Sequence, residues 1–310
     1  RSRKGAEMSK REAWHTTLDK LGDERGFYRR LGATHNALYL KGDSTLVVSF
    51  DNLDDVRQDV AERMPWGSQF ISSRGWSSLG IGAHGWTWYR DEAVFDFFDE
   101  LQQTKFFDQF ENVVFYGTSM GGYAASVFSA AAPGCKVIAM NPQATLERRI
   151  TSGWETRYHK SWRQDFGGRY SYGPTQSQAA EVVYLFYDPY VTEDAMHAAL
   201  YQGANVKKIR CRHFGHGLTS AFNQMGILKE TVNACVNENP TQREIYALMN
   251  ARKTTPRYQK AVLNKLVAQK RHLSTYRFCR QVLGMSGDRP RPHFKRAMAN
   301  AARFLSPEQL

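Results

Sequence analysis

The stretch NVVFYGTSMGGYAASVF, residues 112–128, decides the fold. Residues 113–116 are β-branched or aromatic, which is typical of a buried strand, and the alanine-rich run from Gly121 onward indicates a helix. Ser119 stands between them, with Gly117 and Gly121 two positions away on either side. A strand that turns directly into a helix leaves room only for small neighbours, so this spacing predicts that Ser119 occupies a tight, strained turn.

Strand and helix patterns alternate on both sides of this turn. We expect strands at 45–50, 77–83, 112–116, 136–140, 181–187 and 206–212, and helices at 54–64, 92–103, 121–132 and 218–236. Largely apolar strands that alternate with helices predict an α/β fold, with a mostly parallel, doubly wound sheet covered on both faces. Sites in such sheets lie at the carboxyl ends of the strands.

The predicted turn would present the Ser119 hydroxyl as a nucleophile in front of the amides at a helix N-terminus. A serine hydroxyl needs a general base, and the base needs a carboxylate that orients it. Asp188 follows the strand at 181–187, and His216 stands between two glycines after the strand at 206–212. Both side chains should therefore emerge at the same sheet edge as Ser119.

Two assignments have competitors nearby. His213 closes the strand before His216, and we favour His216 because a base in a glycine-flanked loop reaches a serine more easily. Asp194 competes with Asp188, but it stands at an expected helix start, where an acidic side chain caps backbone amides. His213 and His216 lack a third ligand at helical spacing, so we expect no metal site, and nothing in the sequence calls for a cofactor.

Residues 43–236 resemble the α/β-hydrolase family through three parts: GTSMGG at 117–122, DPYV at 188–191 and GHG at 215–217. The resemblance implies Ser119 as nucleophile, Asp188 as orienting acid and His216 as base. It also implies an oxyanion hole built from the Met120 amide and from an amide near Phe50 or Asp51, although the His-Gly-Gly stretch of lipases is missing there.

The implied reaction is cleavage of an ester or thioester through an acyl-enzyme, which makes the chain a serine hydrolase. Acyl transfer and peptide or amide cleavage are alternatives on the same triad. A different alternative is a hydrolase-like binding module that has little or no catalysis.

An aromatic-rich connection at 144–179 interrupts the alternation. Connections of this length are uncommon, and we weigh equally a lid over the site and a surface excursion that packs on the body. With the loop at 84–91, it supplies four candidate substrate-binding residues: His84, Trp86, Trp154 and Trp162. Aromatic side chains also simply fill cores.

Charge divides the 310 residues unequally. The chain is 42% hydrophobic and 23% charged, which excludes a mostly disordered protein, and its formal charge is +12. Residues 240–310 hold 15 Lys/Arg and 3 Asp/Glu, whereas the remainder holds 27 of each. The excess therefore belongs to a small, basic helical annex at 240–310. Its partner could be an acidic protein, a nucleic acid or a membrane surface, and a plain solvated face is as good an explanation.

Composition also predicts the boundaries of the other two segments of the chain. Residues 1–42 are expected to be a polar, helical N-terminal segment, and 43–239 the hydrolase core. The N-terminal stretch lacks the apolar core of a signal peptide, and no run approaches the ~20 apolar residues of a membrane span. The four cysteines are scattered without CxxC spacing. Together these features predict a cytoplasmic protein with reduced thiols.

Overall fold

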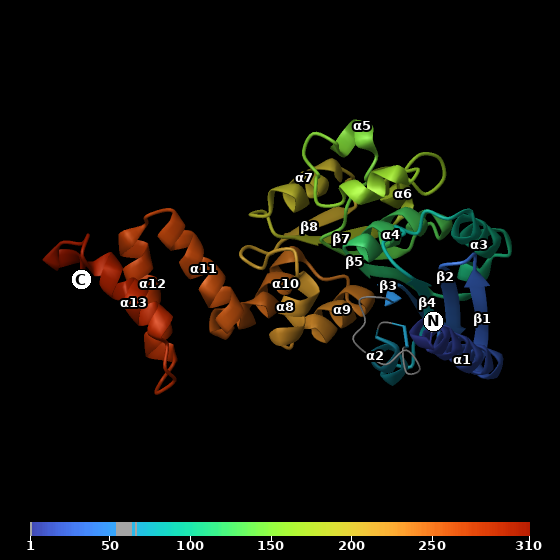
Figure 1. The fold of residues 1–310 in the computed structure, drawn as a ribbon, viewed down its shortest axis with the longest axis horizontal. Helices are drawn as coiled ribbons and strands as arrows, with labels where there is room; N and C mark the ends of the chain where they lie inside the picture. Colours follow the sequence, from blue (N-terminus) through green and yellow to red (C-terminus); the bar gives the residue numbers. More distant parts are fainter. Residues whose placement is uncertain (1, 54–63, 66) are drawn as a thin grey trace.

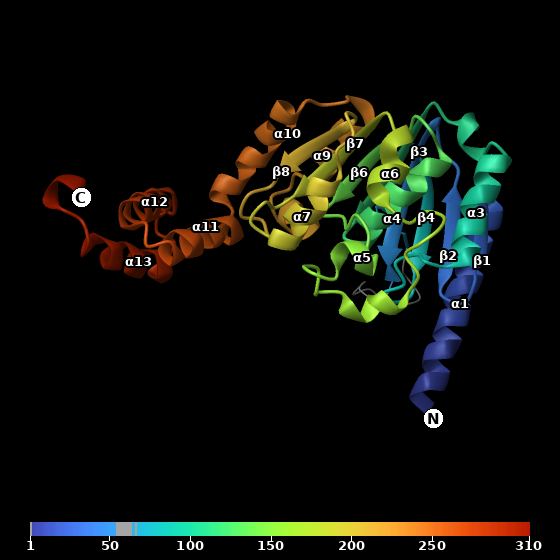
Figure 2. The ribbon, with the colours of Figure 1, turned by 90° about the horizontal axis from the view of Figure 1, so that it is seen from above.

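The computed structural model describes residues 2–53, 64, 65 and 67–310, shown in Figures 1 and 2. An eight-stranded sheet has the strand order β1-β2-β4-β3-β5-β6-β7-β8. The strands are β1 Gly26–Leu31, β2 His35–Leu40, β3 Thr45–Asn52, β4 Ser77–Ala83, β5 Asn112–Thr118, β6 Lys136–Met140, β7 Val182–Tyr187 and β8 Val206–Arg210. Strands β3 to β8 pair in parallel, which confirms the predicted fold class.

The N-terminal segment differs from its prediction. Helix α1, Ser2–Arg25, is present, but the residues after it form β1 and β2, an antiparallel pair that joins β4. Every residue of β2 is buried, because its two faces pack on different layers: Ala37 and Tyr39 in one core, Leu38 and Leu40 against α1. The polar composition of residues 1–42 concealed this pair of strands.

Side chains of the central strands alternate between two cores, as a period of two requires. In β3, Leu46 and Val48 face one core, while Val47 faces the other. The first core lies under the helices α3 Glu92–Gln103, α4 Met120–Phe128 and α7 Thr192–Leu200. The second lies over α2 Ser68–Ser73, α8 Leu218–Gln224, α9 Leu228–Asn237 and α10 Gln242–Leu248, on the opposite face of the sheet in Figure 1.

One predicted helix is divided in the structure, and another lies almost entirely outside the described residues. The predicted helix at 218–236 is two helices, α8 and α9, because Gly226 adopts a left-handed φ of 73° between them. The predicted helix at 54–64 lies outside the described residues apart from Met64. Among the described residues, the structure contains no helix long and apolar enough to cross a membrane.

The C-terminal region divides later than its charge suggests. Helix α10 belongs to the body, since Ile245 within the helix and Met249 just beyond its end are both buried in the second core. The helices α11 Pro256–Ala268, α12 His272–Met285 and α13 Pro292–Ala302 then extend away from the sheet (Figure 1). They have a small core of their own, built from Leu263, Cys279, Val282 and Phe294. A helical C-terminal region is therefore present, in which α10 packs on the body and α11 to α13 share a core of their own.

Candidate active site

Ser119 lies in the turn between β5 and α4, as its glycine neighbours predict. Its backbone has φ 53° and ψ −118°, a conformation that costs about 1–3 kcal/mol for a residue with a side chain. The glycines are required by close packing. A Cβ on Gly117 would come within 2.0 Å of the Gly121 carbonyl oxygen, and one on Gly121 within 2.5 Å of the Phe50 carbonyl oxygen.

His216 lies next to Ser119, in the loop between β8 and α8. The Ser119 Oγ to His216 Nε2 distance is 3.0 Å, within hydrogen-bond reach. The histidine side chain is 32% exposed, so solvent reaches the pair. His213 points elsewhere: its ring packs at a tilt against that of Tyr190, and burial lowers the pKa of its imidazole. Of the two histidines, the structure places His216 at the serine.

Asp194, and not Asp188, lies behind His216. The His216 Nδ1 is 2.8 and 2.9 Å from the two carboxylate oxygens of Asp194, which is buried. With the proton on Nδ1 donated to Asp194, Nε2 is left to accept the proton of Ser119. The three side chains thus form a Ser–His–Asp chain at the carboxyl ends of β5, β7 and β8.

The predicted contact between Asp188 and His216 is wrong. Asp188 follows β7 directly, and its carboxylate turns back to accept hydrogen bonds from the amides of Tyr190, at 2.9 Å, and Gly215, at 2.7 Å. It therefore joins the β7 and β8 loops. The sequence predicts that Asp194 caps a helix, but α7 has no side-chain cap at its N-terminus, and the buried Asp194 carboxylate in its first turn contacts His216.

A buried ion-pair network holds Asp194 from behind. Arg157 contacts Asp194 at 2.8 Å and Glu155 at 2.5 Å, and the side chain of Glu155 is fully buried. The amide of Ala144 donates to His197 Nδ1, so the neutral tautomer of His197 carries its proton on Nε2, 3.1 Å from Glu155. Burial opposes ionisation of Glu155, but the hydrogen bonds from His197 and Arg157 outweigh it and lower its pKa to about 2.

Tyr158 is a site residue that the sequence did not reveal. Its hydroxyl lies 3.2 Å from His216 Nε2 and 3.5 Å from Ser119 Oγ. Burial raises the pKa of this phenol, although the hydrogen bond with Ser119 opposes the shift, so the hydroxyl keeps its proton and can donate. Asn141 also approaches the ring of His216, with its amide nitrogen 3.3 Å away. Tyr158 belongs to the aromatic-rich connection at 144–179, but nothing distinguishes it there from the other aromatic residues, and Asn141 directly follows β6.

The connection at 144–179 joins β6 to β7 and reaches the site. It contributes Glu155, Arg157 and Tyr158, and it is bonded to the loop at 84–91. Arg90 donates to the carbonyl of Gly167 at 2.7 Å, and the indole of Trp88 donates to Ser161 at 2.8 Å. It includes the short helices α5 Arg148–Thr151 and α6 Gly173–Gln176. Because it supplies site residues, it is more than a surface excursion.

The four predicted substrate-binding residues lie in different surroundings. Trp86 is half-exposed, and its ring centroid is 5.8 Å from that of Tyr158, which places it beside the site. Trp154 packs edge-on against the buried His197, behind the ion-pair network. Trp162 lies under the guanidinium of Arg148. His84 lies against Trp14 of α1. Of the four, Trp86 is the one that packs on a residue in hydrogen-bond contact with Ser119.

The predicted oxyanion residues flank the turn. The Met120 amide is at the N-terminus of α4, directly after Ser119. Phe50 and Asp51 lie inside β3, where Phe50 pairs with Ile81 on one side and Gly117 on the other. The Phe50 ring is buried among Phe98, Phe115 and Phe128. Donation by Phe50 or Asp51 stays a prediction, since most of the loop that follows β3 lies outside the described residues.

The strand order, with the serine turn between β5 and α4, defines an α/β-hydrolase fold. A scan against protein-family models finds no match, and neither does a search of curated proteins.

Solved structures do resemble the chain. A capsule O-acetyltransferase of Neisseria meningitidis serogroup A is 13% identical over 68% of this chain and 94% of its own, with a TM-score of 0.44. An esterase of Pyrococcus furiosus is 13% identical over 65% and 85%, with a TM-score of 0.43. Est1E of Butyrivibrio proteoclasticus is 13% identical over 68% and 99%, with a TM-score of 0.42.

Proposed function

We propose that the protein is a serine hydrolase that cleaves an ester or thioester through an acyl-enzyme on Ser119. The observation that carries the proposal is the 3.0 Å contact of Ser119 Oγ with His216 Nε2, with Asp194 on the opposite ring nitrogen. A purely structural turn has no need of a strained serine, a base and a buried acid in one line.

The reaction runs in two balanced halves. His216 Nε2 takes the Ser119 proton as Oγ bonds to the substrate carbonyl carbon, and the imidazolium then gives that proton to the departing alcohol or thiol as its bond to carbon breaks. In the second half, water is the nucleophile. His216 takes a proton from water as the water oxygen bonds to the acyl carbon, and His216 then gives that proton to Ser119 Oγ as the bond between Oγ and the acyl carbon breaks and the acid leaves. Asp194 keeps the imidazole oriented throughout and stabilises its charged form.

The developing oxyanion needs donors on the side of Ser119 that faces the helix. The Met120 amide at the start of α4 supplies one, and the dipole of that helix adds to it. The protonated Tyr158 hydroxyl lies close enough to Ser119 to supply another donor. Trp86 beside it offers an exposed apolar surface for the acyl group or the leaving group.

The test is the hydrolysis of p-nitrophenyl acetate and phenyl thioacetate by the purified chain. We expect turnover of at least one, a Ser119→Ala variant reduced to the background rate, and an unchanged rate for Ser152→Ala, an exposed serine in the same connection. Added alcohols that divert the acetyl group from water to a new ester would identify acyl transfer instead. Turnover that survives Ser119→Ala would refute the proposal.

A further inference from the structure

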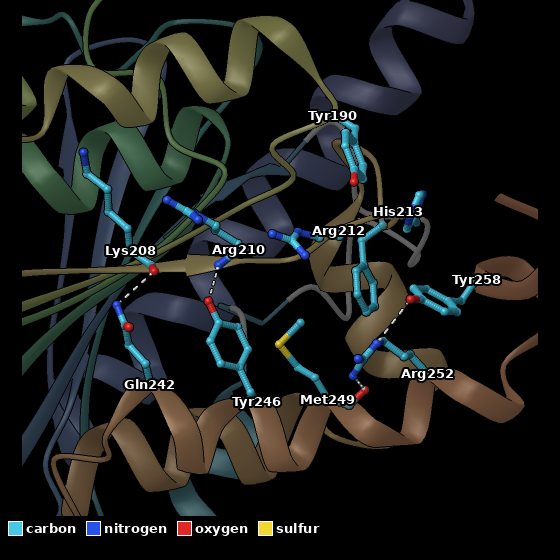
Figure 3. Close-up of a pocket in the computed structure, with 11 residues that line it drawn as sticks. Tyr190, Lys208, Arg210, Arg212, His213, Gln242, Tyr246, Met249, Arg252 and Tyr258 are labelled. Carbon is cyan, nitrogen blue, oxygen red and sulfur yellow. Dashed lines mark hydrogen bonds between the residues drawn. The ribbon is translucent and has the colours of Figure 1, made fainter. Parts of the chain in front are cut away.

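The helices α11 to α13 extend from a part of the body that is bonded to the sheet. The Arg210 amide of β8 donates to the Tyr246 hydroxyl of α10 at 3.0 Å, so α10 is fixed to the edge strand (Figure 3). Farther along the chain, Lys265 of α11 lies over the ring of Tyr190, which turns that face of the helix toward the body. The opposite face of α11 is directed away from the body.

A groove lies between α11 and α13, and the first turn of α12 borders it. Its volume is about 460 Å³. The lining residues recur every three or four positions, so one face of each helix is turned toward the groove. Among them are Leu263 and Val267 on α11, and His293, Ala297, Asn300 and Phe304 along α13 and just beyond it. Most of the lining residues are exposed, so the groove is open to solvent along its length.

Apolar side chains are exposed in this groove. Val267 is 52% exposed, and Phe304, at 69%, has the largest exposed fraction of the large apolar side chains that the structure describes. The Phe304 ring is stacked on that of His272, with centroids 4.1 Å apart, so one of its faces is covered and the other is open. Leu263 and Ala301 lie buried between the helices. Exposed apolar side chains that gather on a polar surface are typical of a binding site.

Positive charge surrounds this apolar surface. Lys270 and Arg296 line the groove, and no aspartate or glutamate does. Residues 256–310 hold 12 Lys/Arg, and their two carboxylates, Asp288 and Glu308, lie outside the lining. Within the described part of the chain, neither Lys270 nor Arg296 forms an ion pair. An occupant whose charge complements the groove must therefore be acidic.

We propose that this groove binds an acidic amphipathic helix of another protein, with its apolar face on Val267 and Phe304 and its carboxylates toward Lys270 and Arg296. A groove between two helices is a common receptor for the apolar face of a third. None of the lining residues belongs to the site at Ser119, so the proposal is independent of the proposed hydrolase activity.

The shape of the groove favours this occupant over the other acidic ones. A small ligand is usually enclosed over most of its surface, whereas most residues of this groove are exposed. Single-stranded nucleic acids stack their bases on aromatic rings, whereas most of the apolar lining here is aliphatic. A membrane surface does not fill a hollow, but a row of side chains on a helix does.

Fluorescence anisotropy of the full chain with labelled synthetic peptides tests the proposal. The first peptide forms a helix with leucines on one face and glutamates on the other. The second has the leucines replaced by glutamines, and the third has the glutamates replaced by lysines. At physiological salt we expect saturable binding of the first peptide, at least about tenfold tighter than that of the second or the third. Equal affinities, or tighter binding of labelled oligothymidylate or of vesicles of phosphatidylserine and phosphatidylcholine in equal parts, would overturn the proposal.

Variants of the chain locate the binding. Val267→Ser combined with Phe304→Ser should weaken binding of the first peptide at least about tenfold, as the loss of an apolar anchor does. The matched control is Met285→Ser combined with Leu310→Ser, which removes two half-exposed apolar side chains outside the groove and should change the affinity less than about twofold. Melting temperatures verify folding, and Val267→Asp alone gives the same test if the loss of the Phe304 ring unfolds the helices. Equal weakening in the two double variants would contradict the proposed groove.

Discussion

Two aspartates, Asp188 and Asp194, border the histidine loop and differ in what they hold. Asp188 fixes backbone, through the amides of Tyr190 and Gly215, whereas Asp194 fixes the imidazole of His216. Both follow β7, so their place in the chain order is equally suitable for an orienting acid. Sequence could therefore predict Ser119 and His216, which have glycine neighbours, but not which carboxylate faces inward from the first turn of α7.

This difference gives a matched pair of variants. Asp194→Asn should lower kcat about 10³- to 10⁴-fold with little change in KM, because the imidazole loses its orientation and the partner of its charged form. Asp188→Asn should lower kcat less than about tenfold, and should act mainly on the melting temperature by loosening two loops. Steady-state kinetics on one ester, beside thermal unfolding, separates the two. A larger loss of kcat in Asp188→Asn than in Asp194→Asn would show that Asp188, and not Asp194, orients the imidazole.

At the scale of elements, the turn between β5 and α4 was the most predictable part of the molecule, because its glycines answer a local steric demand. We expect Gly121→Ala to lower the free energy of unfolding by at least about 2 kcal/mol, since its Cβ would lie 2.5 Å from the Phe50 carbonyl oxygen, a backbone atom. Gly153→Ala is the control, with no atom within 4 Å of the added Cβ. Denaturant unfolding of both variants measures the difference, and equal stabilities would contradict the packing of the turn.

The connection at 144–179 was the least predictable element, because its role depends on a buried network that joins distant residues. Glu155, Arg157 and Asp194 come from two segments, and a sequence pattern cannot show that their charges meet. In the structure, the connection contacts Asp194 through Arg157 and places the Tyr158 hydroxyl beside Ser119 and His216.

That network makes acid stability depend on Glu155. Its pKa is about 2 in the folded chain, below its ordinary value of 4.5, so its stabilisation is present above pH 4.5 and is lost as the pH falls toward 2. Glu155→Gln should therefore lower the free energy of unfolding by about 3 kcal/mol at pH 7, and most of the difference should be lost near pH 2. The exposed Glu238→Gln is the control, with no difference expected. A difference that is constant with pH would exclude the ionised carboxylate as its cause.

At the scale of the whole molecule, the excess charge and the packing divide the C-terminal region from the body at different residues. The excess charge begins at residue 240, but Ile245 and Met249 are buried in the body, and α11 to α13 have their own small core. Residues 256–310 carry 12 Lys/Arg and 2 Asp/Glu, so the extended helices hold most of the excess. Composition could predict a basic annex, but not that its first helix completes the core beside β8.

Two truncations distinguish these boundaries. A chain that ends at residue 255 should melt within a few degrees of the full chain. A chain that ends at residue 239 should be much less stable, because removal of a large buried side chain costs about 2–5 kcal/mol. We expect both to elute from a polyanion resin at lower salt than the full chain, as loss of a cationic surface requires. Equal stability of the two, or unchanged elution, would contradict the division.

Reaction with a fluorophosphonate tests most directly whether Ser119 is an activated nucleophile. The reagent forms a covalent bond with a serine only where a base activates the hydroxyl. Mass spectrometry of the treated, folded chain should find one adduct, on Ser119, with none in Ser119→Ala and strongly slowed formation in His216→Ala. An unmodified Ser119 in the folded chain, or an adduct at another serine, would contradict the proposed site.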